Sequence, residues 1–321
     1  MSWPHRLFAG QFTDFELKLL RVFRVVVDCG GFTAAEAEIG LTKSAISKHV
    51  SDLEIRLGVR LCERGRGGFA LTEAGKVVYE AISQLLVSFE EFRSRINAFH
   101  SELMGEFYIG FIDTLVTHET APLREILSEY SRAHPAIRLN MMIGSESEID
   151  RAVEERRLHI GVSVVNDRPT RALILPFAIE TGYLYCGRGH EAFAMDDAEL
   201  KGNRLATFAL VQHGYSAAES RLISELGLKS AATSHQTEGV LFMVLAGTHI
   251  GFLPDHYAAA WEARGMIRRM GPKEIVKTTK TAFKANRASL ANPMVRSFLA
   301  VAKARKKSAE TGASVRTLPH A

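Results

Sequence analysis

Cysteine is scarce in this chain of 321 residues, and its three cysteines, Cys29, Cys62 and Cys186, lie far apart. An odd, widely spaced set fits neither a zinc motif nor a disulfide framework, which favours a reducing compartment. Catalytic motifs are also missing: we find no GxSxG elbow, phosphate loop, HExxH or dinucleotide-type GxGxxG after a predicted strand. The 12 histidines show no pair at a metal-binding spacing. We therefore expect no enzyme, no cofactor and no metal.

Long hydrophobic runs are absent as well. The longest, such as Val240–Ala246, are far shorter than the roughly 18 residues that span a bilayer. Residues 1–11 lack the apolar core of a signal peptide. We therefore expect a cytoplasmic protein with no membrane partner. The net charge of +4 permits nucleic-acid binding without requiring it, and 46% hydrophobic residues suffice for the cores of two or three domains.

What the chain does contain is two short helices joined by a tight turn within residues 32–57. Thr33 is predicted to cap the first helix, with Glu36 completing a capping box, and Gly40 ends it. Thr42 is predicted to cap the second helix. That helix has a single apolar stripe, formed by Ile46, Val50, Leu53 and Leu57. Its opposite face carries hydrogen-bond donors, namely Lys43, Ser44, Ser47, Lys48, His49 and Ser51. This division suits insertion into the major groove of DNA, and an ordinary helical hairpin with a solvated face is the alternative.

The neighbouring segments complete the pattern of a winged DNA-binding domain. A further helix is predicted to begin at Thr13, where Glu16 forms a second capping box. Residues 59–71 read as two short strands around a basic, glycine-rich turn, which is typical of a wing. Between Lys43 and Arg66 there are six basic and three acidic residues, so positive charge is concentrated where DNA phosphates would lie.

Residues 73–100 are predicted to form one long helix with an apolar seam. The seam residues step by four and three: Val78, Ile82, Leu85, Phe89, Phe92, Ile96 and Phe99. One helix cannot bury such a heptad pattern alone, so we expect it to pair with a second copy of the chain. Packing of the seam against the helix's own domain is the alternative.

The stretches GGFTAAEAEIGLTKSAISKHVSDLEIRLGVRLCER and LTEAG resemble the winged helix-turn-helix of LysR-type transcriptional regulators. The resemblance implies a bacterial, nucleoid-associated, sequence-specific regulator controlled by a small-molecule effector. The expected partners are double-stranded DNA with an interrupted dyad operator, RNA polymerase if the protein is an activator, and further copies in a homodimer and a homotetramer. The residues expected to contact DNA are Thr33, Thr42, Lys43, Ser44, Ser47, Lys48, His49, Arg64 and Arg66.

The chain departs from the usual family residues at several positions. Lys43, Ser44, Lys48 and His49 stand where the family favours Gln, Pro, Arg and Gln. Cys62 replaces a usual phenylalanine. That replacement favours a buried core residue over a redox sensor activated by the nearby arginines.

From Gly105 the pattern changes to alternating strands and helices. Strands are predicted at 107–111, 137–143, 159–165, 173–178, 183–186, 205–211, 250–253 and 277–284. Helices are predicted at 122–133, from 147, at 217–226, at 239–246 and from 292. This alternation argues for parallel sheets with crossover helices, and it resembles the two-lobed, periplasmic-binding-protein-like effector domain of the same family.

The predicted fold class is therefore α/β overall, with four parts. A winged helix-turn-helix at 13–72 is followed by a dimerisation helix at 73–100, an effector domain at 105–302 and a basic tail at 303–321. Lobe I comprises about 105–179 and 276–302, and lobe II about 180–275.

The effector is expected to bind between the lobes. Ligands of open α/β sheets bind beyond the carboxyl ends of the strands, where helix N-termini favour anions. By resemblance to the family, Thr114 and Ser145 of lobe I lie where a carboxylate effector is often held. His213 and Tyr215, in a loop of lobe II, complete the expected effector-binding residues, and His213 could instead satisfy a loop carbonyl. Helix capping explains a Ser or Thr in such loops equally well.

Two acidic residues leave the chemical class of the effector open. Asp113 and Glu146 lie in the same loops and would disfavour a bare anion unless a cation balances them. A different class of protein, a solute-binding protein or an enzyme acting through residues 105–302, is the alternative. An export signal or a catalytic constellation would distinguish it, and we find neither.

Overall fold

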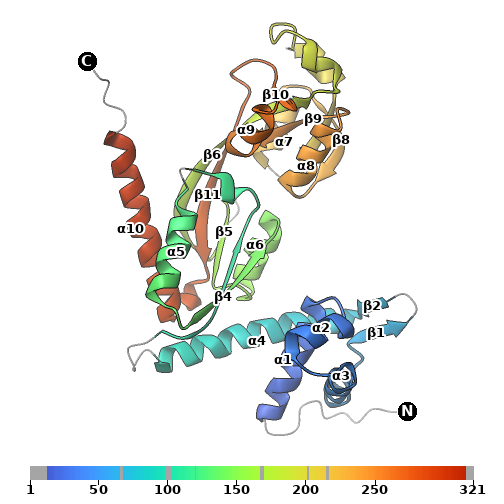
Figure 1. Ribbon diagram of the computed structural model, residues 1–321, viewed down its shortest axis with the longest axis vertical. Coiled ribbons are helices and arrows are strands. Elements are labelled where there is room, and N and C mark those ends of the chain that lie inside the picture. Colours follow the sequence, from blue (N-terminus) through green and yellow to red (C-terminus); the bar gives the residue numbers. More distant parts are fainter. Residues whose placement is uncertain are drawn as a thin grey trace. The chain divides into compact units, whose positions relative to one another are not determined.

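The computed structural model describes residues 13–65, 68–97, 103–119, 121–166, 170–200, 202–214 and 217–315 (Figure 1). The chain forms two compact units, Met1–Phe89 and Glu90–Ala321. The boundary falls inside the long helix α4 (Glu73–Asn97), which therefore contributes residues to both units. Each unit has a buried hydrophobic core of its own.

The first unit is a winged helix-turn-helix. Its other elements are α1 (Asp14–Asp28), α2 (Phe32–Ile39), α3 (Lys43–Leu57), β1 (Cys62–Gly65) and β2 (Gly68–Leu71). The predicted stripe of α3 holds it together, because Ile46, Val50 and Leu53 are buried in one core with residues of α1. Strands β1 and β2 pair antiparallel as the wing. Cys62 is 1% exposed in the same core, as its interpretation as a core residue requires.

Two of the predicted helix caps are confirmed. At α1 the backbone N–H of Thr13 donates to Oε2 of Glu16 over 2.9 Å, as in a capping box. At α3 the hydroxyl of Thr42 accepts from the backbone N–H of Ala45 over 3.4 Å. Both caps satisfy backbone donors that the first turn of a helix leaves without a partner.

The predicted cap at Thr33 is wrong. The N-cap of α2 is Gly31, whose φ of +153° is a backbone conformation that side-chain-bearing residues rarely adopt, so the helix begins at Phe32 and Thr33 lies inside it. Glu36 has a different partner: its Oε1 accepts from the backbone N–H of Lys43 over 2.5 Å. Glu36 therefore caps the recognition helix α3 rather than its own helix.

Gly75 explains the motif LTEAG. A Cβ atom at this position would lie 1.9 Å from the carbonyl oxygen of Leu61, which no side chain tolerates. The Thr72 hydroxyl accepts from the Gly75 N–H over 2.9 Å, and the Thr72 N–H donates to Leu61 O over 3.1 Å. These contacts fix the start of α4 against the residue that precedes the wing.

The apolar seam of α4 is divided between two environments. Ile82 is 3% exposed and Val78 packs against the core of the first unit, so both belong to the fold and Ile82 is not available to a second chain. Farther along, Leu85, Phe92 and Ile96 are exposed, Phe92 by 60%. Phe89 is half-buried, and Phe99 lies outside the described residues. Pairing of two chains through the exposed part of the seam stays a prediction.

The second unit contains one β-sheet of nine strands, in which some pairs are parallel and others antiparallel (Figure 1). The strands are β3 (Gly105–Phe111), β4 (Ile137–Ile143), β5 (Ile160–Val164), β6 (Leu173–Gly187), β7 (Ala209–His213), β8 (Lys229–Ser234), β9 (Ile250–Pro254), β10 (Ile267–Arg269) and β11 (Val276–Ala285). Their order is β4-β3-β5-β11-β6-β9-β7-β8, and β10 pairs with β6.

Helices cover this sheet. They are α5 (Leu123–Ala133), α6 (Glu146–Glu154), α7 (Ala217–Glu225), α8 (Thr237–Leu245), α9 (Asp255–Glu262) and α10 (Pro293–Val315). Short 3₁₀ helices lie at Leu115–Thr117, Glu191–Ala194, Gly202–Thr207 and Arg287–Ala291. Helices α5 and α10 pack together, and the hydroxyl of Tyr130 on α5 donates to Met294 O on α10 over 3.1 Å.

The sheet is shared by two lobes. Buried residues before Ala178 and after Thr281 form one core, and those between Leu184 and Ile275 form two others. Strands β6 and β11 pair antiparallel and pass from one lobe to the other. We call these two the connecting strands. Within the lobes, β3 pairs parallel with β4 and β5, and β7 pairs parallel with β8 and β9, as the alternating pattern predicted.

Several parts of the second unit differ from the sequence prediction: α9 and β10 were not predicted, and α10 continues to Val315, into the predicted basic tail. The two strands expected at 173–178 and 183–186 are one strand, β6, because the polar residues between them are where it passes between the lobes. The strand expected at 205–211 begins only at Ala209, after a 3₁₀ helix. The edge strand β8 was not predicted, since its side chains are polar or small, are mostly exposed and show no apolar alternation.

A buried ion pair attaches α6 to the sheet. The Lys284 ammonium on β11 is 5% exposed and lies 2.7 Å and 2.9 Å from the two carboxylate oxygens of Asp150 on α6. It also donates to Val164 O over 2.8 Å. The hydroxyl of Ser163 donates to Asp150 over 2.5 Å. This cluster sets the position of α6, whose N-terminal residues lie at the end of β4.

We expect Asp150→Ala to lower the free energy of unfolding of the second unit by about 3 kcal/mol, because it leaves a buried ammonium without its counter-charge. Urea unfolding of the full chain, followed by circular dichroism, measures the loss. The double variant Asp150→Ala, Lys284→Met removes both charges and should be less destabilised than Asp150→Ala alone. Equal losses in the two variants would contradict a charge-based role for this pair.

Candidate functional site

The outer face of α3 presents the side chains predicted to read DNA. Lys43, Ser44 and Lys48 are exposed, and Ser47 is half-buried beside them. The Thr42 and Ser44 hydroxyl oxygens lie 3.1 Å apart at the start of the helix. A helix with a buried stripe on one side and lysine and serine donors on the other can place those donors against base edges and phosphates.

His49 lies differently from its neighbours. Its ring is half-buried and meets Phe15 of α1 edge to face, with ring centroids 6.2 Å apart. The Phe15 ring also faces the Arg56 guanidinium at 5.3 Å, and Arg56 pairs with Glu16. His49 therefore takes part in docking α3 onto α1, a role that the sequence pattern did not indicate.

The structure describes some of the other residues that are expected to contact DNA. Thr33 is exposed on α2. Arg64 is in β1, opposite Phe69 of β2, and its side chain lies outside the described residues. Arg66, in the turn of the wing, also lies outside them.

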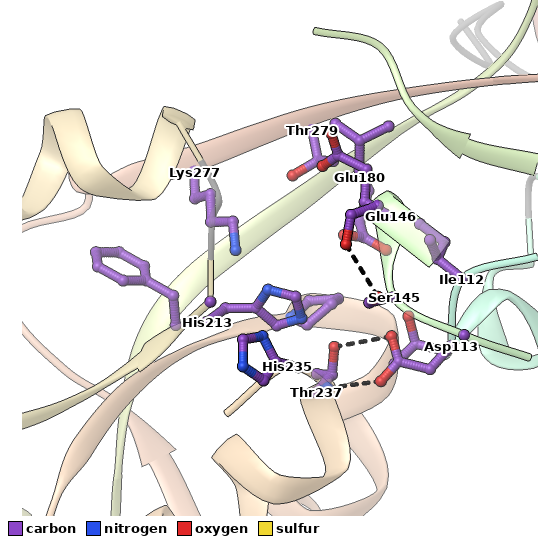
Figure 2. Close-up of a pocket in the computed structure, with 17 residues that line it drawn as sticks. Ile112, Asp113, Ser145, Glu146, Glu180, His213, His235, Thr237, Lys277 and Thr279 are labelled. Carbon is purple, nitrogen blue, oxygen red and sulfur yellow. Dashed lines mark hydrogen bonds between the residues drawn. The ribbon is translucent and has the colours of Figure 1, made fainter. Parts of the chain in front are cut away.

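In the second unit a cavity of about 380 Å³ lies between the lobes (Figure 2). Lobe I contributes the loop after β3 and the loop between β4 and α6. Lobe II contributes the ends of β7 and β9 and the turn before α8. The connecting strands add Glu180, Lys277 and Thr279. The carboxyl ends of parallel strands thus face the cavity, which is the usual place for a ligand in an α/β sheet.

Three of the four predicted effector residues line this cavity, and Tyr215 lies outside the described residues. Thr114 has a φ of +67°, which is rare for a β-branched residue and marks a strained turn at the cavity. Ser145 is also a helix cap, since its hydroxyl accepts from the Glu148 N–H over 3.4 Å and donates to Oε2 of Glu148 over 2.7 Å. The hydrogen bonds that the Glu148 carboxylate accepts from the hydroxyl and the backbone N–H of Ser145 hold its pKa below the ordinary value. Ser145 therefore caps α6, as the alternative interpretation predicted, and it also lines the cavity.

His213 is positioned by a buried carboxylate. Its backbone N–H donates to Oε1 of Glu219 over 2.8 Å, and Glu219 is fully buried. Burial of the His213 ring, reinforced by the nearby Lys277 ammonium, lowers its pKa, so the ring is neutral near pH 7. A neutral imidazole can donate one hydrogen bond and accept another from a ligand.

A hydrogen-bonded contact joins the lobes at the cavity, and a second, between the Thr117 hydroxyl and Nδ1 of His256 at 2.8 Å, joins them outside it. The Asp113 carboxylate of lobe I accepts from the Thr237 backbone N–H over 2.5 Å and from the Thr237 hydroxyl over 3.2 Å (Figure 2). Thr237 is the first residue of α8 in lobe II, so Asp113 stabilises the positive end of that helix. The contact can form only while the lobes are close together.

Sequence reasoning missed several residues that line the cavity. Glu180, Lys277 and Thr279 lie on the connecting strands, where the sequence carries no loop or motif to mark them. His235 follows β8, which was not predicted, and Thr237 begins α8. Asp113 and Glu146 were placed in the loops after two predicted strands, but they were considered only for the effect of their charge on the effector.

A winged helix-turn-helix joined to a two-lobed α/β domain with a cavity between the lobes defines a DNA-binding regulator with a ligand-binding domain. Two family descriptions match the chain: "Bacterial regulatory helix-turn-helix protein, lysR family" over residues 17–76 and "LysR substrate binding domain" over residues 100–307. The chain belongs to the LysR family of bacterial transcriptional regulators.

A curated relative, the HTH-type transcriptional activator BauR of Pseudomonas aeruginosa, is 40% identical over 264 residues, which cover 82% of this chain and 87% of BauR. Among solved structures, CbnR, a LysR family transcriptional regulator, matches with a TM-score of 0.61 and 19% identity over 91% of this chain and 99% of its own. Full-length CbnR complexed with its target DNA matches with a TM-score of 0.60 and 19% identity over 90% of this chain and 99% of that one. Within the described residues, no helix is both long and apolar enough to cross a membrane.

We expect Lys48→Ala to weaken operator binding by about tenfold and to reduce the dependence of log affinity on log salt by about one, because it removes one positive charge from the DNA face. Fluorescence anisotropy at several salt concentrations measures both effects. Lys280→Ala, which removes the same charge from an exposed position on β11, is the matched control. Unchanged affinity and salt slope for Lys48→Ala would contradict the placement of this helix face on DNA.

Proposed function

We propose that this regulator binds an interrupted dyad operator as a homodimer, assembled further into a homotetramer, and that a small molecule in the interlobe cavity sets its activity. The name of the 40% identical relative supports an activator, which would act through RNA polymerase. Such a protein would work in the cytoplasm at the bacterial nucleoid. The carboxylate effector expected from the family resemblance stays a prediction.

The composition of the cavity carries the proposal. Its lining comes from both lobes and from the two connecting strands, so a ligand would contact every part whose movement changes the lobe arrangement. A ligand shifts a conformational equilibrium only by its difference in affinity for the two states. A site with walls on both lobes supplies that difference, since opening the lobes separates half of its contacts.

A variant of Thr114 tests this role. We expect Thr114→Val, which keeps the shape and removes the hydroxyl, to weaken effector binding by roughly ten- to hundredfold if the hydroxyl binds a charged group of the ligand. The affinity of the unliganded protein for its operator should stay nearly the same. A ligand found by thermal shift on the full chain would be titrated into a promoter-reporter assay. Full responses in Thr114→Val, Ser145→Ala and His213→Ala alike would place the effector elsewhere.

A variant of α4 tests the dimer. We expect Leu85→Glu to release monomers and to weaken operator binding, because it places a charge in the exposed apolar seam of α4. Sedimentation velocity on the full chain measures the oligomeric state. Val116→Glu adds the same charge at an exposed apolar position outside α4 and should leave assembly unchanged. A dimer that persists in Leu85→Glu would show that α4 does not pair the chains.

A further inference from the structure

The charges around the interlobe cavity are strongly unbalanced. Among the described residues that line it, Asp113, Glu146 and Glu180 carry carboxylates, and Lys277 carries the one ammonium. In the view of Figure 2, the three carboxylates lie to one side of the cavity and Lys277 to the other. The charge alone does not make a site; the cavity between the lobes does, and its charges decide which ligand it takes.

The ammonium is already neutralised by the protein itself. Nζ of Lys277 lies 2.6 Å from Oε2 of Glu219, a side chain with no solvent exposure. The same carboxylate accepts from the His213 N–H through its other oxygen. Because Lys277 and Glu219 cancel, the carboxylates of Asp113, Glu146 and Glu180 dominate the charge of the lining, to which His213 and His235 add imidazole rings.

The helix N-termini at the cavity are occupied in the same way. Asp113 accepts from the first N–H of α8, at Thr237. At α6, Oε2 of Glu148 accepts from the backbone N–H of Ser145 over 2.8 Å and from its hydroxyl over 2.7 Å. At both places a carboxylate of the chain thus already takes donors at the start of the helix, so a ligand carboxylate would bind beside like charge.

The other two carboxylates have an amide and an imidazole as partners, and neither partner is a lysine or an arginine. Oε1 of Glu146 accepts from the Asn166 side-chain amide over 2.6 Å. Oε2 of Glu180 lies 3.1 Å from Nε2 of His256. Each carboxylate has sites for about four hydrogen bonds, so both can accept further donors from a ligand. The partners also hold the two side chains in fixed positions at the cavity wall.

We infer that the effector carries a positively charged nitrogen, an alkylammonium group, which binds against Glu146, Glu180 and Asp113. An ammonium supplies three hydrogen-bond donors and a positive charge that balances these carboxylates. Hydrogen bonds between charged groups are roughly twice as strong as those between neutral groups. A dicarboxylate of similar length brings like charge into the site. This inference rests on the proposed function, since it assumes that the interlobe cavity is the effector site.

Three four-carbon probes that differ in their end groups test the charge: 1,4-diaminobutane, 4-aminobutanoate and butanedioate. Each is titrated into the full chain by calorimetry at concentrations up to about 10 mM. We expect binding by at least one of the two amines and none by butanedioate. Binding by butanedioate, or no binding by either amine, overturns the inference.

Two charge-neutralising variants test the position. Glu146→Gln and Glu180→Gln keep the size of the side chain. Each should raise the dissociation constant of the amine by about tenfold. Glu154→Gln, on the same helix as Glu146 but exposed and outside the cavity, is the matched control and should bind as the native chain does. Equal affinities in all three variants overturn the inference.

The experiment separates failure of this inference from failure of the proposed function. If butanedioate binds and Thr114→Val weakens it, the interlobe cavity is the effector site and only the inferred charge of the ligand is wrong. If an amine binds and neither Thr114→Val nor the two glutamine variants change its affinity, the ligand site lies elsewhere and both fail. Circular dichroism and operator affinity of each variant show that the fold is retained.

Discussion

The second unit depends on one structural constraint, the antiparallel pair of connecting strands β6 and β11 that both lobes share. The register runs from Val276 opposite Tyr183 to Ala285 opposite Leu173, so each strand contributes to both lobes. Glu180, Lys277 and Thr279 lie where these strands pass the cavity. A ligand there would touch the segments that set the angle between the lobes. The same connection thus holds the lobes together and gives a bound molecule a direct way to change their arrangement.

Much of the fold could be predicted because its determinants are local. The apolar stripe of α3 and the Thr13 and Thr42 caps follow from side chains a few residues apart, and the structure confirms them. The cap at Thr33 failed because Gly31, through its backbone conformation, moved the start of the helix. The strand β6 looked like two because residues between lobes need not show the apolar alternation of a half-buried sheet. When a residue packs against a distant part of the chain, its neighbours in the sequence do not indicate that contact.

The candidate site shows the same division. The loops after predicted strands pointed to Asp113, Thr114 and Ser145, because strand ends in parallel sheets converge. The pair between Lys277 and Glu219 joins residues 58 positions apart, and only the folded chain shows that the lysine is neutralised. Sequence reasoning could list the charges near the cavity but could not tell which of them cancel. That cancellation decides the net charge that a ligand meets.

The contact between Asp113 and Thr237 links ligand charge to lobe closure. It stabilises the close arrangement, because a carboxylate at a helix N-terminus satisfies backbone donors and interacts favourably with the helix dipole. The same arrangement brings Asp113 to a cavity that Glu146 and Glu180 also line, and like charges in one cavity repel. A cation between them removes that repulsion only while the lobes are close. Each tenfold preference of a ligand for the close arrangement shifts the equilibrium by about 1.4 kcal/mol. Asp113 would thus take part both in closing the lobes, through Thr237, and in binding the positive charge of a ligand.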